Sequence, residues 1–248
     1  MTTIAHKSAK PSHYDKEAKH YDAFNENGSK IINKTIEEIL KKHKVTTVLD
    51  LACGTGSQVF WLSKKGFKVT GVDINEKMLD IAKRKSRSEI MKPTFMKGDM
   101  RKSHVGEFDA VLTIFNAIGH LTKADFNKSL HNIYKNLNEN GLYIFDIFNL
   151  SYLLKDDNIT KLTIDWQKKS GNTTAREIQY STISNDGILA SYDIYHEQKG
   201  KAKPKITTAY QTLQVYSAKQ LTEMLKKNGF NNYRPHSGRY CYGKTPME

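Results

Sequence analysis

The sequence is poor in cysteine, and Cys53 and Cys241 are the only two among its 248 residues. A secreted fold of this size stapled by disulfides would carry more of them, so we expect a protein of the reducing cytoplasm. Long apolar runs are also missing, which argues against a membrane span and against a secretory signal. The nine histidines show no Cys-x-x-Cys or His-Glu-x-x-His spacing, so nothing in the sequence supports a metal site.

Acidic residues are in the minority among the charged ones. The chain has 39 Lys and Arg against 26 Asp and Glu, a formal net charge of +13. That balance suits nucleic acid, an anionic membrane surface or an acidic small substrate. With 38% hydrophobic residues the chain is too apolar for a disordered protein, and its length fits one large domain or a domain with a subdomain.

Apolar strands alternate with helices along the first part of the chain. The strand-like runs are 45–51, 67–74, 93–97, 108–115 and 142–148, and the helical runs are 14–21, 31–40, 58–65, 76–85 and 123–137. Such alternation predicts an α/β fold in which helices cover both faces of a mostly parallel sheet.

Residues 149–216 have a different character. They contain four further strand-like runs without a crossover helix between them, at 159–166, 174–183, 188–196 and 206–215. A helix at 219–227, with Ser217 as its N-cap, and strands at 230–236 and 239–244 then return to the first pattern. We therefore predict an α/β domain made of residues 1–148 and 217–248, interrupted by an antiparallel β subdomain at 149–216.

A glycine-containing loop follows the first predicted strand. Gly54 and Gly56 allow a sharp turn and close approach to a ligand, and the next helix begins with free backbone amides. Val59 stands where a dinucleotide fold places its third glycine, and Asp50 would repel a phosphate. An acid at this place suits a ligand with a positive amino group, such as S-adenosylmethionine.

Two further acids follow the next two strands. Asp73 ends the second strand, where a carboxylate accepts hydrogen bonds from both ribose hydroxyls of a nucleoside. Asp99 follows the third strand, where we expect it to take the adenine amino group, and Met100 is expected to flank the adenine ring. A purely structural interpretation, with turn glycines and capping acids, is the alternative.

With these acids and glycines in this order, the chain resembles the class I S-adenosylmethionine-dependent methyltransferases. The resemblance implies a Rossmann-like sheet of seven strands, mostly parallel with the last strand antiparallel, and S-adenosyl-L-methionine as cofactor. It implies cofactor contacts from this set: Tyr21, Asp50, Ala52, Gly54, Gly56, Asp73, Ile74, Met78, Asp99, Met100 and Phe115.

Within that class the chain is most similar to the N-methyltransferases of nucleotide-linked deoxysugars, and more loosely to glycine N-methyltransferase-like enzymes. The similarity is carried by the 14–21 helix, by Phe115-x-x-x-Gly119-His120-Leu121 and by Ser237-Gly238-Arg239-Tyr240. It implies that the inserted subdomain forms a substrate lid and, in many members, the surface of a homodimer.

Four residues are candidates for chemistry. Tyr14 and Tyr21 lie seven residues apart, on one face of a continuous helix, and the family implies a tyrosine hydroxyl near the methyl donor; ordinary helix packing is the alternative. An imidazole ordinarily titrates near neutral pH, so His120 is a candidate general base, or else a core histidine. Arg239 is a candidate for an anionic group of the acceptor, or else a solvated arginine.

The leading hypothesis is a cytoplasmic enzyme that methylates a nitrogen, with oxygen as the second choice, of a small and anionic acceptor. An RNA methyltransferase is the alternative that the charge supports. The basic residues are spread along the chain, and no Asn-Pro-Pro-Tyr-like or Pro-Cys motif follows the fourth strand, which argues against nucleic acid. A non-catalytic binding module is the third hypothesis, opposed by the intact acids at 50, 73 and 99.

Overall fold

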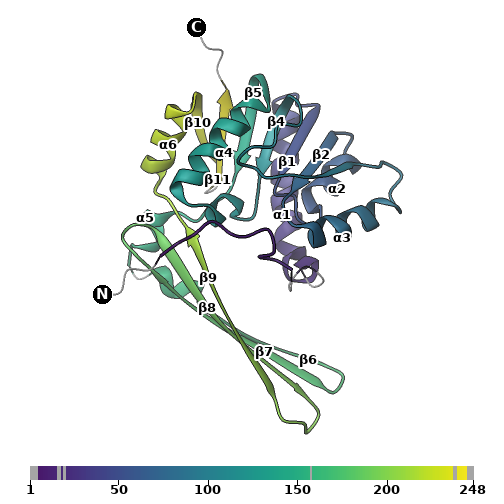
Figure 1. The fold of residues 1–248 in the computed structure, drawn as a ribbon, viewed down its shortest axis with the longest axis vertical. Helices are drawn as coiled ribbons and strands as arrows, with labels where there is room; N and C mark the ends of the chain where they lie inside the picture. Colours follow the sequence, from purple (N-terminus) through teal and green to yellow (C-terminus); the bar gives the residue numbers. More distant parts are fainter. Residues whose placement is uncertain (1–4, 16–17, 19–20, 157, 237–238, 245–248) are drawn as a thin grey trace. The chain divides into compact units, whose positions relative to one another are not determined.

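The computed structural model describes residues 5–15, 18, 21–156, 158–236 and 239–244. The chain divides into two compact units (Figure 1). The larger unit comprises residues 8–147 and 221–248, and the smaller unit comprises residues 1–7 and 148–220. Each unit contains a sheet of its own.

A seven-stranded sheet forms the centre of the larger unit, in the order β10-β11-β5-β4-β1-β2-β3. Strands β1 to β5 are mutually parallel, and β11 is antiparallel to both of its neighbours. The fold class predicted from the sequence is therefore confirmed. The strands are β1 Thr47–Leu51, β2 Lys68–Asp73, β3 Thr94–Lys97, β4 Phe108–Thr113, β5 Leu137–Phe145, β10 Phe230–His236 and β11 Arg239–Lys244.

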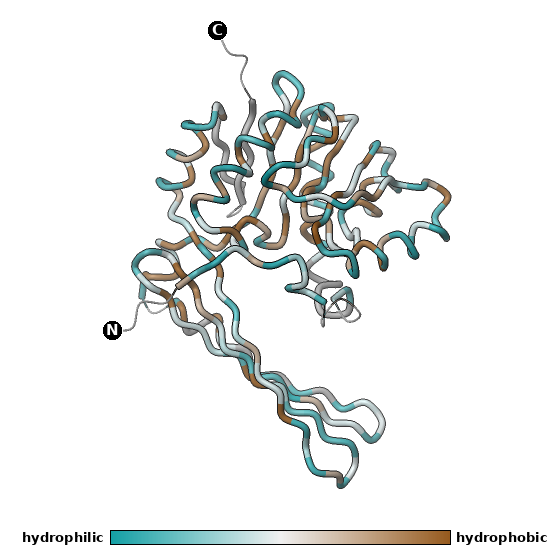
Figure 2. The backbone as a smooth tube through the Cα atoms, in the orientation of Figure 1, coloured by the Kyte–Doolittle hydropathy of each residue, from teal (hydrophilic) through white to brown (hydrophobic). Residues whose placement is uncertain are grey.

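Helices pack against this sheet, and the core lies between the sheet and the helices. The central strands are apolar along most of their length (Figure 2), because a parallel sheet covered on both faces leaves no strand face to water. Leu49 of β1, Val111 of β4 and Leu40 of the first helix are completely buried. The helices are α1 Tyr21–Lys42, α2 Ser57–Lys64, α3 Glu76–Ser86, α4 Lys123–Lys135 and α6 Ala218–Lys227, with a 3-10 turn at Ala117–His120. Of the helices in the described ranges, none is both long enough and apolar enough to cross a bilayer.

The N-terminal part of the larger unit differs from the prediction. Residues 11–15 form turns rather than the start of a helix, and α1 runs unbroken through Gly28 from Tyr21. A tertiary contact overrides the helical pattern here: the Asn75 side-chain amide donates to the Pro11 carbonyl at 2.7 Å and to the Asp15 carboxylate at 3.0 Å. The predicted helix at 14–21 is therefore wrong at Tyr14, and its residues 16, 17, 19 and 20 lie outside the described residues.

The smaller unit contains a four-stranded antiparallel sheet in the order β6-β7-β8-β9. The strand predicted from residue 159 begins later, because residues 158–162 form a 3-10 turn. The buried Asn158 closes this turn by donating its side-chain amide to the Tyr152 carbonyl at 2.9 Å. The elements are β6 Ile164–Ser170, β7 Thr173–Ile183, β8 Ile188–Lys199, β9 Lys205–Gln214 and the short helix α5 Leu150–Leu153.

Candidate functional site

A pocket of about 820 Å³, including space open to solvent, lies in the larger unit at the carboxyl ends of β1, β2 and β4. In open α/β sheets this edge is where ligands bind. The pocket brings together most of the residues predicted from the sequence: Tyr14, Tyr21, Ala52, Gly54, Asp73, Ile74, Met78, Asp99, Met100, Phe115 and His120. Two predicted residues do not line it: Asp50 and Gly56.

The glycine loop after β1 is shaped by backbone conformation. Ala52 and Gly54 both have positive φ values, 69° and 54°, and the amide of Ala52 donates to the Val72 carbonyl of β2 at 2.7 Å. Gly56 serves packing beneath the loop, since a Cβ there would lie 2.8 Å from the Phe60 ring and 2.9 Å from the Phe95 ring. The loop is therefore held against β2 and presents Ala52 and Gly54 to the pocket.

Asp73 is fixed at the end of β2 by two backbone amides. Its Oδ2 accepts from Gly54 N and its Oδ1 from Asn75 N, each at 2.7 Å. Burial raises the pKa of this carboxyl, and the backbone hydrogen bonds oppose that rise. Each carboxylate oxygen has a second lone-pair site, so Asp73 can also accept from a bound diol.

Asp50 lies under the pocket rather than in its wall. Its side chain is 1% exposed, and its Oδ2 accepts no hydrogen bond from any described residue. Burial, together with the nearby negative charge of Asp73, raises the pKa of Asp50 to about 8. A buried carboxylate without a donor is costly, so this position favours a cation or a hydrogen-bond donor supplied by a ligand.

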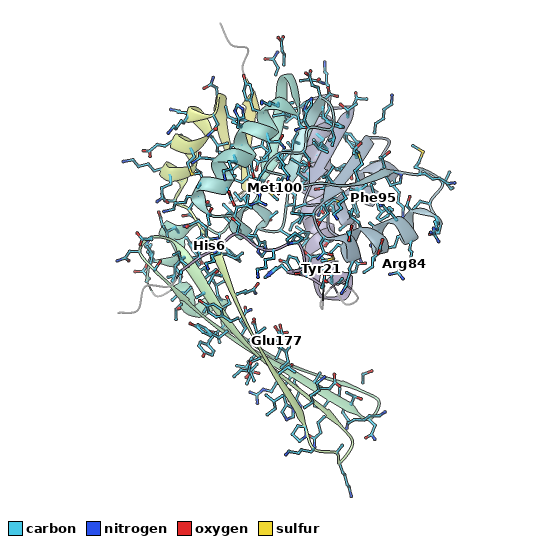
Figure 3. All side chains as sticks on the ribbon, viewed as in Figure 1. His6, Tyr21, Arg84, Phe95, Met100 and Glu177 are labelled. Carbon is cyan, nitrogen blue, oxygen red and sulfur yellow. The ribbon has the colours of Figure 1, made fainter. Side chains whose placement is uncertain are left out.

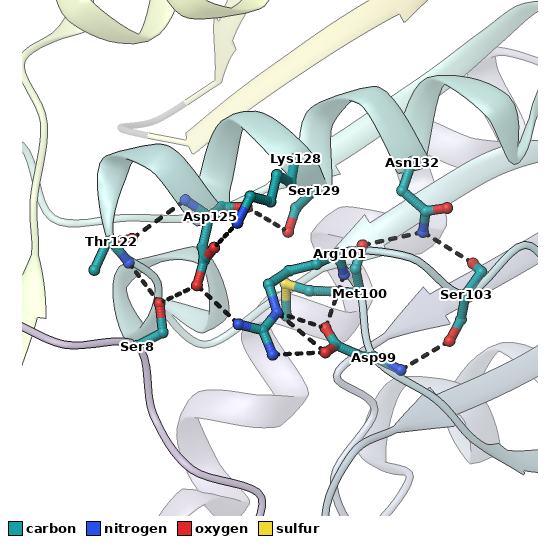
Figure 4. A network of polar contacts seen from close by, with 10 residues as sticks. All are labelled: Ser8, Asp99, Met100, Arg101, Ser103, Thr122, Asp125, Lys128, Ser129 and Asn132. Carbon is teal, nitrogen blue, oxygen red and sulfur yellow. Dashed lines mark hydrogen bonds and ion pairs between the residues drawn. The ribbon is translucent and has the colours of Figure 1, made fainter.

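Asp99 is engaged in a way that the sequence did not indicate. Arg101 Nε donates to both Asp99 oxygens at 2.9 and 3.0 Å, and Arg101 Nη2 donates to Oδ2 at 2.6 Å (Figure 4). Burial alone would raise the pKa of Asp99, but the hydrogen bonds and positive charge of Arg101 outweigh it and lower the pKa. The carboxylate proposed for the adenine amino group is thus occupied largely by Arg101.

Residues 8–14, here called the N-terminal segment, form the opposite wall of the pocket. The Tyr14 hydroxyl lies 2.7 Å from His120 Nε2, and Ala9 N donates to the His120 carbonyl at 2.8 Å. The His13 ring is centred 4.7 Å from that of Tyr14 and 5.1 Å from that of His120. The two residues predicted to carry chemistry, Tyr14 and His120, are therefore in direct contact.

Tyr21 begins α1 beside this cluster, where Figure 3 labels it. Its ring is centred 5.6 Å from that of Tyr14. Burial raises the pKa of its hydroxyl to about 12, with smaller contributions from surrounding acids led by Asp73. Tyr21 thus presents a protonated hydroxyl to the pocket at neutral pH, which suits binding rather than proton abstraction.

Sequence reasoning missed several residues of the pocket wall, among them Lys10, His13, Asn75 and Arg101. Asn75 had a detectable signal, because an Asn directly before a helical run is a typical N-cap. Its Oδ1 accepts from Met78 N at 2.9 Å, as an N-cap does. His13 and Arg101 follow no such local rule, since tertiary contacts alone bring them to the pocket.

Arg239 lies on β11, where its backbone pairs with His236. Its side chain and residues 237–238 fall outside what the structure describes, so its predicted contact with the acceptor stays a prediction. No cluster of three or more His, Cys, Asp or Glu side chains suited to a metal ion occurs among the described residues.

Residues 48–141 match the family described as "Methyltransferase domain". YqeM of Bacillus subtilis is 29% identical over 199 residues, which cover 75% of this chain and 74% of YqeM. Human glycine N-methyltransferase is 32% identical over 133 residues, covering 47% of this chain and 45% of that enzyme. The chain thus spans less than half of that enzyme's length.

A similar fold occurs in CalS10, an amino pentose methyltransferase from Micromonospora echinaspora solved with S-adenosylmethionine bound. The two structures superpose with a TM-score of 0.78 over 91% of this chain and 96% of CalS10, at 16% sequence identity. At that identity the likeness bears on the fold alone.

Proposed function

We propose that this chain is an S-adenosylmethionine-dependent methyltransferase and that it transfers the methyl group to a nitrogen atom of a small molecule. The direct contact between Tyr14 and His120 in the wall of the pocket carries this proposal. The names of two similar proteins support it, because one acts on glycine and the other on an amino pentose. Oxygen remains the second choice of acceptor atom.

The residues present fit the cofactor. Asp50 has a buried carboxylate oxygen without a donor, which suits the ammonium of the methionine part. Asp73 has lone pairs left for the ribose hydroxyls, and Gly54 carries no side chain to block the approach. Ile74 and Met100 line the same pocket and offer apolar contact to a purine. These residues would hold S-adenosylmethionine, which supplies an electrophilic methyl group when bound.

The residues of the chain contribute to the reaction in two ways. They align the two reactants, and they accept one proton from the attacking amine. An amine at neutral pH carries a proton, and it must lose that proton before its lone pair can attack carbon. His120 can accept the proton at a ring nitrogen, and the Tyr14 hydroxyl at 2.7 Å holds the ring in place. Alignment of two reactants in one pocket can lower the activation barrier by roughly 7 to 11 kcal/mol.

The methyl acceptor would bind beside the N-terminal segment and His120, where the side chains that line the pocket are neutral or basic. Lys10 lines the pocket, and its ammonium forms no ion pair with a described residue. His13 and His120 lie beside it, whereas the acids Asp50 and Asp73 lie on the glycine-loop side. This separation of charge supports an acceptor with a carboxylate or phosphate group.

A methyl-transfer screen with mass detection tests the proposal. The acceptors would be amino acids, amino sugars and their nucleotide-linked forms, simple alcohols, and RNA. We expect a mass increase of one methyl group on an amine that also carries an anionic group, and a much slower increase with His120→Ala. Methylation of RNA alone, or of alcohols alone, would contradict it.

A further inference from the structure

Arg101 connects two parts of the larger unit that are distant in sequence. Its Nη1 donates to Asp125 Oδ2 at 2.8 Å, while its remaining nitrogens hold Asp99 (Figure 4). Asp99 lies in the loop after β3, and Asp125 lies in the first turn of α4. One guanidinium fork thus bridges two carboxylates, a geometry that lysine cannot reproduce.

Asp125 passes this connection to the N-terminal segment. The Ser8 hydroxyl donates to Asp125 Oδ2 at 2.7 Å and accepts from Thr122 N at 3.0 Å. The next residue, Ala9, donates its amide to the His120 carbonyl. The start of the segment that carries Tyr14 is therefore tied to Asp125 through Ser8.

We propose that Arg101 is a positioning residue that couples the Asp99 side of the pocket to the N-terminal segment. Without the bridge from Asp99 to Asp125, Ser8 loses its fixed acceptor and the contact between Ala9 and His120 opens more often. Binding of a nucleoside at Asp99 then changes how firmly Tyr14 is held against His120. The ligand part of this inference rests on the proposed function, but the bridge itself does not.

Hydrogen exchange of the Ala9 amide is the direct measurement of the bridge. In the ligand-free protein we expect exchange at least tenfold faster with Arg101→Gln, which removes the bridge, and with Asp125→Asn, which keeps the contact between Arg101 and Asp99. Arg101→Lys keeps the charge without the fork and should give an intermediate rate. The matched control is Lys128→Gln. Lys128 is another partner of Asp125, its side chain is 67% exposed, and its loss should leave the exchange rate unchanged. Equal exchange in all five proteins would overturn the inference.

A second arm uses S-adenosylhomocysteine as the probe. In the wild type its binding should slow exchange of the Ala9 amide further, and in Asp125→Asn it should not. Equal slowing in both proteins would show that the coupling does not run through Asp125 and would overturn the inference. If the wild type does not bind this probe in calorimetry, the proposed function fails, while the ligand-free rates still decide the role of Arg101.

Discussion

The two walls of the pocket are built by different means. On the glycine-loop side, backbone amides and the β1–β2 ladder hold Ala52 and Asp73 in place. On the other side, the N-terminal segment is held mainly by side-chain contacts across long separations, such as Tyr14 with His120 over 106 residues. The wall held by backbone hydrogen bonds forms together with the sheet. The wall held by side chains depends on a few contacts that single substitutions can remove. We therefore expect mutations to separate cofactor binding from methyl transfer.

His120→Ala should have the largest effect, confined to the wall held by side chains. Loss of a general base reduces rates by roughly 100-fold or more, because the amine then relies on solvent to take its proton. Single-turnover methyl transfer would measure the rate, and calorimetry with S-adenosylmethionine would measure the affinity, which should stay unchanged. A parallel fall in both quantities would show that the two walls are not separable.

Asp50→Asn should act on the other wall alone. Removal of a charged hydrogen-bond partner costs about 1.5 to 3 kcal/mol, so we expect cofactor affinity to fall by roughly tenfold to 100-fold. Glu76→Gln is the control, because Glu76 is a carboxylate that pairs with exposed Lys97 and does not line the pocket. Unchanged affinity with Asp50→Asn would remove the proposed role of this carboxylate.

Tyr14→Phe should have a smaller effect than loss of His120. The change removes one hydroxyl and its hydrogen bond, worth about 0.5 to 1.5 kcal/mol, and keeps the ring contacts with His13 and Tyr21. We expect a fall in methyl-transfer rate of up to about tenfold with unchanged cofactor affinity. A fall as large as that with His120→Ala would instead make Tyr14 a direct participant.

The smallest effect should be on the pH dependence of stability in the cofactor-free protein. The pKa of Asp50 is raised by burial from 3.8 to about 8, so the folded state keeps a proton that the unfolded state releases. The stabilisation from this group is complete below pH 3.8 and is lost as the pH rises through about 8. Between pH 6 and 9, thermal unfolding should therefore show a larger fall in Tm for the wild type than for Asp50→Asn. Parallel curves would contradict the raised pKa.

The same contrast explains what the sequence could predict. The order of strands and helices, the glycine loop and Asp73 follow from local rules, because hydrophobic period and turn residues act over a few positions. Arg101 and His13 follow no local rule, and the turn at residues 11–15 is set by Asn75 over 64 residues. Local rules therefore indicated the parts of the site that the backbone determines. They missed His13 and Arg101, which reach the pocket through tertiary contacts alone, whereas Tyr14 and His120 were named from the family resemblance.

For the smaller unit, the sequence predicted which elements occur but not their bounds, their contacts or their role. A 3-10 turn at residues 158–162 stands where the sequence predicted part of a strand. Asn158 at its start donates to the Tyr152 carbonyl, a contact that strand propensity does not take into account. The predicted lid and dimer surface of the insertion at 149–216 stay predictions. In the smaller unit the rings of Tyr180, Tyr192 and Tyr210 lie side by side across three strands, with centroids 5.0 and 4.9 Å apart. This alignment follows from strand register, which the sequence alone did not fix.

The pairing of β11 with β5 has a consequence for synthesis of the chain. Tyr240 lies opposite Phe145 in this ladder, so residues 148–220 of the smaller unit are synthesised between the two partners. At about 5 to 20 residues per second, the ribosome needs roughly 5 to 20 seconds to deliver β11 after β5. During that interval the outer edge of β5 lacks its final neighbour and can pair with other nascent chains.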